Sequence, residues 1–216
     1  MRIKKDPEIR KEKFMQTASK LFMQKGYDAV SIREILDGVG DKTSSPSVFY
    51  YYFTSKENLY RSCMQHIAAT YLASLAPGFS ENEKSLSEQY DFLVRQLKNN
   101  LEKNRRLLQT GSSTANRLSI LDMREQVTSA SARMWADYLI RTKHYSIDEA
   151  CMKAQFLSGG IGEMIYQYMI EKNHGQKTPA FVIAWIIHFI LANIRFSAEE
   201  KAALQEAGKK YGKEKA

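Results

Sequence analysis

The residues from Ser44 to Lys56 combine hydroxyl groups, aromatic rings and a lysine in a very short segment. Ser45 followed by Pro46 predicts that a helix begins there, because a serine oxygen caps free N–H groups and proline fits the first turn. Ser55 precedes the start of another helix only a few residues later. The first helix is therefore barely two turns long, and it must pack against other elements to persist because helix nucleation is costly.

The two faces of this short helix differ in chemistry. At about 100° per residue, Phe49 and Phe53 point to one side of the helix, which suits attachment to a core. The opposite side presents Ser47 and Tyr51, with Val48 on its flank. Hydroxyl groups, a ring and a pair of methyl groups suit phosphate oxygens and base edges in a DNA groove. A short core helix with a few spare polar residues is the alternative interpretation.

Two predicted helices precede this segment and would support it. Apolar residues at helical spacing predict one helix over 7–25, ending at Gly26. Ser31 and Glu34 have the spacing of a capping box, which predicts a second short helix that ends by Gly40. A helix-turn-helix unit places its second helix in the major groove of DNA while the first helix braces it. The order of elements here fits such a unit.

The remainder of the chain also predicts helices, and the expected fold class is all-α. Four prolines and eleven glycines in 216 residues, with few alternating β-branched runs, favour that class. The stretch from Ala76 to Gly78 is expected to end one helix, and residues 208–216 are expected to form a frayed basic tail. Helices are expected over about 54–75, after a capping box at 80–83, over 105–110, 116–141, 147–173 and 179–196, and from 198 onward.

Composition limits the classes of protein that this chain can represent. Hydrophobic residues make up 44% and charged residues 26%, as in ordinary soluble globular proteins, and the net charge of +8 is compatible with a polyanionic partner. Cys63 and Cys151 belong to no C-x-x-C pair, which argues against a disulfide framework or a zinc site. The N-terminus has no secretory signal, and the apolar run of 181–192 is too short to span a bilayer. A soluble, cytoplasmic protein without a metal or cofactor is expected.

The sequence shows no signature of catalysis. The four histidines have no H-E-x-x-H spacing, and no serine lies in a G-x-S-x-G motif. The glycines of 159–162 follow no predicted strand, so a phosphate-binding loop is not indicated there. Glycines in an apolar helical pattern indicate instead a close approach of two helices. No enzymatic activity is expected.

Residues 10–60 resemble the N-terminal domain of the TetR (tetracycline-repressor) family of bacterial transcription regulators. The resemblance is carried by an ordered set of short matches at the spacings of the family. The matching pieces are Phe14-Met15, Thr17-Ala18, Leu21-Phe22, Gly26-Tyr27, Ser31-Ile32, Ile35, Gly40, Phe49-Tyr50, Phe53 and Ser55-Lys56-Glu57-Asn58-Leu59.

The resemblance implies two domains. A DNA-binding domain would cover residues 6–66, with the helix-turn-helix at about 31–53. A ligand-binding and dimerisation domain would follow over 67–207, before the basic tail of 208–216. The turn ahead of the recognition helix is longer than the usual family pattern by about three residues, Asp41 to Thr43, which can change how that helix enters the groove.

The residues expected to face DNA carry hydroxyl, aromatic, methyl or cationic groups around the helix-turn-helix. Lys56 and Tyr50 match phosphate contacts of the family. The start of a helix at Ser31 offers N–H groups and a partial positive charge to a phosphate. The full set is Ser31, Arg33, Thr43, Ser44, Ser45, Ser47, Val48, Tyr50, Tyr51 and Lys56.

The C-terminal domain offers candidates for a ligand pocket and a dimer interface. Glu163 lies on a mostly apolar helix, where a buried carboxylate would favour a cationic or hydrogen-bonding ligand or would pair with Arg117 or Arg133. The candidate pocket residues, whose composition also fits a plain helical core, are Phe92, Gln96, Met123, Trp135, Tyr138, Phe156, Glu163, Met164 and Tyr166. The last two long helices form the dimer in the family, and the candidate interface residues are Ile161, Tyr168, Trp185, His188, Phe189 and Ala192.

These features predict a homodimeric DNA-binding regulator, and specifically a repressor that an unknown small-molecule effector releases from a palindromic operator in double-stranded DNA. A dimer would give a two-turn helix more affinity, since it reads two half-sites at once. The alternatives are a DNA-binding factor of the same fold without small-molecule control, and a helical small-molecule carrier or enzyme. Salt-dependent binding to a palindromic duplex separates both DNA-binding functions from the carrier or enzyme. Loss of that binding with ligand separates the first two.

Overall fold

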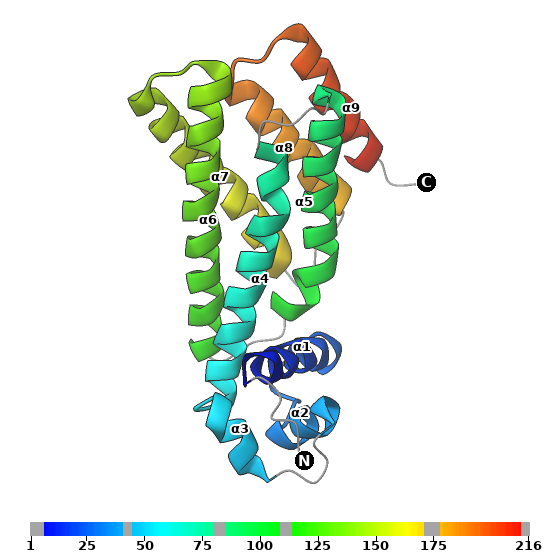
Figure 1. Cartoon of the computed structure of the whole chain (residues 1–216). Helices are drawn as coiled ribbons and strands as arrows, with labels where there is room; N and C mark the ends of the chain where they lie inside the picture. Colours follow the sequence, from blue (N-terminus) through cyan, green and yellow to red (C-terminus); the bar gives the residue numbers. More distant parts are fainter. Residues whose placement is uncertain (1–6, 41–44, 80–84, 109–113, 171–177, 213–216) are drawn as a thin grey trace. The chain divides into compact units, whose positions relative to one another are not determined.

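The protein is all-α, as predicted. The structure, a computed structural model, describes residues 7–40, 45–79, 85–108, 114–170 and 178–212, and all regular secondary structure in these ranges is helical (Figure 1). The helices are α1 Pro7–Lys25, α2 Ile32–Val39, α3 Pro46–Tyr52, α4 Lys56–Phe79, α5 Leu86–Leu108, α6 Thr114–Lys143, α7 Ile147–Ile170, α8 Pro179–Asn193 and α9 Ala198–Gly212.

The chain forms two compact units. The first unit comprises Met1–Ile67 and Arg106–Met123, and the second comprises Ala68–Arg105 and Arg124–Ala216. Helices α4, α5 and α6 each contribute residues to both units. This division differs from the expected boundary after residue 66 in that residues 106–123 fall in the first unit.

Local capping chemistry sets several helix ends where the sequence predicts them. Gly26 follows α1 with a φ of 84°, and Gly40 follows α2 with a φ of 88°, a left-handed conformation that suits glycine. Ser31 and Glu34 form the predicted capping box, in which each side chain bonds the backbone N–H of the other residue. Thr178 caps α8 by accepting a hydrogen bond from the N–H of Phe181 at 3.2 Å.

The predicted end of α4 at Ala76–Gly78 is wrong, because the helix continues to Phe79 with Pro77 inside it. Packing partners stabilise this last turn. The Gln89 amide donates to the Gly78 carbonyl oxygen at 2.6 Å, and the Arg141 guanidinium donates to that of Phe79 at 3.0 Å. These bonds satisfy two carbonyl groups of the turn that contains Pro77.

Three other predicted helix boundaries either differ from the structure or lie outside the residues that it describes. The capping box predicted at 80–83 lies outside the described residues, and the box that precedes α5 is formed by Ser85 and Glu88. The short helix predicted over 105–110 is wrong, since Arg105 lies inside α5. The frayed tail predicted from Gly208 is also wrong over its first residues, because α9 continues through Gly208 to Gly212.

Each unit has its own apolar core. In the first unit, Phe14 and Phe22 of α1 are fully buried, together with Ile35 and Leu36 of α2. In the second unit, α8 packs against both α7 and α9. A Cβ added to Gly160 of α7 would lie 2.8 Å from the Phe189 ring of α8, so this glycine marks the predicted close approach of two helices.

Candidate functional site

The short helix α3 is held by its phenylalanine face. Phe49 and Phe53 are 0% and 1% exposed, and their ring centres lie 6.2 and 6.1 Å from that of Phe14. The Tyr52 ring lies 5.6 Å from the same Phe14 ring and is half-buried. Such aromatic contacts supply the packing that a helix of seven residues needs in order to persist.

The opposite face of α3 is open to solvent. Tyr51 is 75% exposed and Tyr50 is 54% exposed, an unusual degree of exposure for two large aromatic side chains. Ser45 and Ser47 are also exposed, and their hydroxyl groups contact each other. Val48 is half-buried at the side of the helix. The face therefore presents phenol and hydroxyl groups, which can donate to phosphate oxygens and base edges.

The predicted cap at the start of α3 is not formed. Ser45 occupies the capping position in extended conformation, but its side chain makes no capping hydrogen bond, and its hydroxyl contacts Ser47 instead. Thr43 and Ser44 lie outside the described residues, as do Asp41 and Lys42 of the longer turn. The start of α3 is thus shaped by Pro46 rather than by a serine cap.

Two predicted contacts on α2 have partners within the chain. The Ser31 hydroxyl accepts from the N–H of Glu34 at 3.1 Å and lies 3.0 Å from its carboxylate. The Arg33 guanidinium pairs with Asp37 at 3.5 Å on the exposed surface. Lys25 pairs with Glu34 at 2.7 Å, and this ammonium and the backbone N–H of Ser31 hold the pKa of Glu34 at about 2. The start of α2 is therefore stabilised from within the chain.

Lys56, the first residue of α4, is fastened to the segment between α1 and α2. Its ammonium donates to the carbonyl oxygens of Tyr27 at 3.1 Å and Val30 at 3.0 Å. It also lies 4.2 Å above the Tyr27 ring, which is a cation–π contact. A lysine in the first helical turn, unfavourable for the helix dipole, thus has partners inside the chain, and it does not by itself require an external one. An ammonium has three N–H donors, and the two carbonyl bonds use two of them.

The second unit contains a mostly apolar pocket. Its cavity volume is about 130 Å³, and α4 to α9 all contribute to its walls. Trp135 and Tyr138 are the two predicted pocket residues that line it. Its other polar groups include Tyr90, Thr128 and Ser158, none of which was among the predicted pocket residues. Their only signal in the sequence is a small or phenolic polar residue within an apolar helical stripe.

The other predicted pocket residues lie elsewhere. Phe156 is 60% exposed on α7, and Phe92 lines a separate polar cleft with Asp91 and Arg95. For Glu163 the alternatives were a buried carboxylate that faces a ligand and an ion pair with an arginine such as Arg117 or Arg133. Its side chain is 43% exposed and it pairs with a different arginine, Arg124. Gln96, Met123, Met164 and Tyr166 are half-buried and do not line the pocket. Helical periodicity identifies the apolar face of each helix, but it does not show which part of that face borders a cavity.

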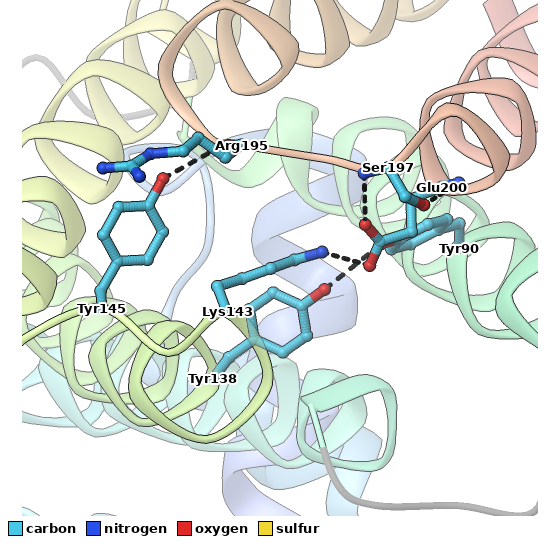
Figure 2. Close-up of polar contacts among 7 residues, drawn as sticks. All are labelled: Tyr90, Tyr138, Lys143, Tyr145, Arg195, Ser197 and Glu200. Atoms are coloured by element: carbon cyan, nitrogen blue, oxygen red, sulfur yellow. Dashed lines mark hydrogen bonds and ion pairs between the residues drawn. The ribbon is translucent and has the colours of Figure 1, made fainter.

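A buried polar cluster borders the pocket on the side of Tyr138 (Figure 2). The Tyr90 and Tyr138 hydroxyls lie 3.3 Å apart. Lys143 of α6 forms an ion pair with Glu200 of α9, and both side chains are at most 10% exposed. Glu200 also accepts from the N–H of Ser197 at 2.8 Å, which completes a capping box at the start of α9. The cluster links α5, α6 and α9.

Helices α7 and α8 leave large apolar side chains on the surface. Met152 and Phe156 of α7 are 69% and 60% exposed, and Phe181 and Trp185 of α8 are 46% and 54% exposed. Of the predicted dimer residues, Trp185, His188 and Ala192 are exposed and Phe189 is half-buried. Two are placed differently, since Ile161 lines the pocket and Tyr168 is 2% exposed beneath Arg105.

Among the described residues, no helix combines the length and the apolar character needed to cross a membrane. Over the same ranges, no three His, Cys, Asp or Glu side chains come together as metal ligands would. Cys63 is buried and Cys151 is exposed, and both are free thiols.

Comparison with known proteins gives a consistent result. Residues 14–63 match the family described as bacterial regulatory proteins, tetR family. No curated protein sequence matches the chain.

Several solved structures share the fold. A TetR/AcrR-family transcriptional regulator from Thermobifida fusca is 20% identical, with a TM-score of 0.57 over 87% of this chain and 100% of that one. The fatty acid degradation regulator FadR from Bacillus halodurans is 14% identical, with a TM-score of 0.53 over 95% of each chain. A tetR-family regulator from Streptomyces coelicolor is 16% identical, with a TM-score of 0.54 over 94% of this chain and 89% of that one. At these identities the likeness establishes the fold.

The matched segment covers α1 from Phe14 onward, α2, α3 and α4 up to Cys63, and it includes the helix that carries the exposed Tyr50 and Tyr51. Members of the matched family are transcriptional regulators and not enzymes. Residues 14–63 therefore match the tetR family of bacterial regulatory proteins, and the chain as a whole shares its fold with solved regulators of that family.

Proposed function

We propose that this protein represses transcription by binding a palindromic operator as a homodimer, and that a small-molecule effector releases it. The DNA-binding part of this proposal rests on one observation. Tyr50, Tyr51, Ser45 and Ser47 stand exposed on a helix whose other face is anchored by phenylalanines. A short helix with a fixed back and an open polar front is suited to the major groove. The protein would act in the cytoplasm, where bacterial DNA lies.

The proposed DNA contacts fall into two groups. Tyr51, the most exposed large residue of α3, would contact base edges. Tyr50 and the remaining donor of Lys56 would contact phosphates on either side of the groove. Arg33 and the hydroxyls of Ser45 and Ser47 would add outer contacts. Phosphate contacts position the protein and base contacts specify the sequence, so the two groups should respond differently to mutation.

The exposed apolar residues of α7 and α8 support the homodimer. Met152, Phe156, Phe181 and Trp185 are each more than 45% exposed. The chain has nothing in its described residues that covers them, and clustered exposed apolar side chains commonly mark a protein interface. A second copy that supplies the same two helices would bury both sets in a two-fold four-helix contact.

Ligand control is supported by the pocket of the second unit. It lies among the same helices that carry the proposed dimer face, since Ile161, Ile186 and Ile190 line the pocket from α7 and α8. An effector that favours one dimer geometry over another would shift the population away from the state that fits both half-sites. Helix α4, which contributes to both units, is the proposed lever.

Selection of bound fragments from random double-stranded DNA with the purified protein tests the DNA-binding function. A palindromic sequence, bound with a strong salt dependence, is the expected result. Selection of no common sequence would overturn the proposal. A common sequence without two-fold symmetry would overturn the dimeric part of it. A ligand screen that never lowers operator affinity would favour a regulator of this fold without small-molecule control.

A further inference from the structure

We propose that the pocket of the second unit binds a small, uncharged and largely apolar molecule through one hydroxyl or carbonyl group, with Ser158 as its hydrogen-bond partner. That this ligand is the effector rests on the proposed function. Its structural basis is independent of DNA, because every residue that lines the pocket belongs to the second unit.

The walls of the pocket exclude a charged ligand. Leucine, isoleucine, valine and aromatic side chains make up most of them, including Leu75, Val94 and Ile186. Among the described residues, no aspartate, glutamate, lysine, arginine or histidine lines the cavity. A carboxylate or ammonium that entered it would lose its hydration without gaining a counter-charge, which is strongly unfavourable.

Ser158 supplies the polar contact that an uncharged ligand can use. It is 4% exposed on α7, and its hydroxyl oxygen is buried with no hydrogen-bond partner among the described residues. A buried hydroxyl with no partner is destabilising, and a partner supplied by a ligand would remove that cost. A serine hydroxyl both donates and accepts, so an alcohol or a carbonyl compound would satisfy it.

The tyrosine pair adds a second polar point but no charge. Tyr90 and Tyr138 share one hydrogen bond at 3.3 Å, which leaves one phenolic proton for a further acceptor. Burial raises the pKa of both phenols, so both stay neutral at physiological pH. Lys143 and Glu200, which lie near the tyrosine pair, neutralise each other in an ion pair (Figure 2). The pocket therefore offers a few neutral hydrogen-bonding groups and no net charge.

The size of the cavity limits the ligand further. A volume of about 130 Å³ is close to that of engineered apolar cavities that bind benzene. A single six-membered ring or a short branched chain would fill it. Larger effectors would require the walls to move.

The test uses four probes that each carry one benzene ring and one further carbon atom, with the full-length protein in the absence of DNA. The probes are benzyl alcohol, toluene, benzoate and benzylammonium, and binding is measured by calorimetry and by ligand-detected NMR. Benzyl alcohol is expected to bind roughly fivefold more tightly than toluene, which corresponds to one net hydrogen bond. Benzoate and benzylammonium are expected to bind at least about tenfold more weakly than benzyl alcohol.

Two serine variants assign the contact. Ser158→Ala should abolish the preference for benzyl alcohol over toluene, and it should fold normally because it removes a hydroxyl that has no partner. Ser129→Ala is the matched control, since Ser129 is exposed on α6 and does not line the pocket. This control should keep the preference unchanged.

Three results would overturn the inference. These are saturable binding of benzoate or benzylammonium as tight as that of benzyl alcohol, an unchanged preference in Ser158→Ala, and no saturable binding of benzyl alcohol at its solubility limit. Failure of the proposed function is visible separately, in the operator assay. If benzyl alcohol binds as expected but leaves operator affinity unchanged, the pocket chemistry is supported and the ligand-released repressor is not.

Discussion

The ammonium nitrogen of Lys56 lies 4.2 Å from the centre of the Tyr27 ring. Lys56 also donates hydrogen bonds to the carbonyl oxygens of Tyr27 and Val30. Together these contacts hold the start of α4 against the turn that follows α1. The residue most readily assigned to a phosphate thus also holds the DNA-binding unit together. A loss of DNA binding on its mutation has two possible causes, which need to be measured apart.

Lys56→Ala is expected to lower the free energy of unfolding by roughly 1–3 kcal/mol, because it removes two hydrogen bonds from a charged donor. It should also reduce affinity for operator and for random DNA by similar factors. The slope of log affinity against log salt should become shallower by about 0.9 if one phosphate contact is lost. Urea unfolding and gel-shift titration at two salt concentrations measure the two effects.

The control for this variant is Lys201→Ala on α9, an exposed lysine whose removal changes the net charge equally. It should leave unfolding and the salt slope unchanged. Lys56→Ala with normal stability and a normal salt slope would show that Lys56 contacts neither the carbonyl groups nor DNA as described.

Tyr51→Ala is expected to weaken operator binding more than binding to random DNA. The side chain is 75% exposed, so its removal should change the free energy of unfolding by less than about 0.5 kcal/mol. A lost base contact is worth roughly 1–3 kcal/mol, which is about five- to 150-fold in operator affinity. Equal losses on both DNAs would assign Tyr51 to the phosphate backbone instead.

If the proposed homodimer forms through α8, Trp185→Glu is expected to give a monomer and to lower operator affinity more than tenfold, because the two half-sites are then bound independently. Analytical ultracentrifugation and gel shift measure these effects. Ile9→Glu is the control, since Ile9 is 63% exposed on α1 in the other unit. A Trp185→Glu variant that stays dimeric would place the interface away from the exposed face of α8.

Gly159→Ala and Gly160→Ala form a matched pair on α7. Both replacements raise helix propensity by about 1 kcal/mol. A Cβ at Gly159 meets nothing within 4 Å, whereas a Cβ at Gly160 lies 2.8 Å from the Phe189 ring. Thermal unfolding should therefore show a higher midpoint for Gly159→Ala and no gain, or a loss, for Gly160→Ala. A lower midpoint together with dissociation in Gly159→Ala would show that a second copy fills the open space.

Glu34 should make the free energy of unfolding depend on pH in the acidic range. Lys25 and the capping box hold its pKa at about 2, below its ordinary value of 4.5. A carboxylate with a lowered folded-state pKa stabilises the fold fully above pH 4.5, and this contribution disappears as the pH falls towards 2. Glu34→Gln should thus be less stable than the parent at pH 5.5, and the two should converge near pH 2.5 in urea titrations. Glu12→Gln, on an exposed position of α1, is the control.

The sequence predicts well those features that depend on neighbours in the chain. The capping box at Ser31 and the glycine after α1 need only local backbone geometry, and both are confirmed. The end of α4 depends on Gln89 and Arg141, which come from α5 and α6. No local pattern around Pro77 reports such partners, so the predicted break was wrong.

The same distinction applies to the sites. The two faces of α3 follow from helical periodicity, and the buried phenylalanines and exposed Tyr51 lie where the periodicity places them. The pocket depends on the relative rotation of six helices, which periodicity does not fix. Trp135 and Tyr138 could be predicted as pocket residues because they lie one turn apart on one face of α6. The ion pair between Glu163 of α7 and Arg124 of α6 could not be predicted, because it depends on how the two helices pack.

The positions of the two tryptophans, Trp135 in the pocket wall and Trp185 on the exposed face of α8, also give the protein two intrinsic optical reporters. The emission of Trp135 would respond to the arrival of a molecule in the cavity. The emission of Trp185 would respond to the exclusion of water when a second copy associates. Variants that keep only one indole, Trp185→Phe or Trp135→Phe, would let effector entry and subunit association be timed separately in one stopped-flow experiment, without attaching a dye.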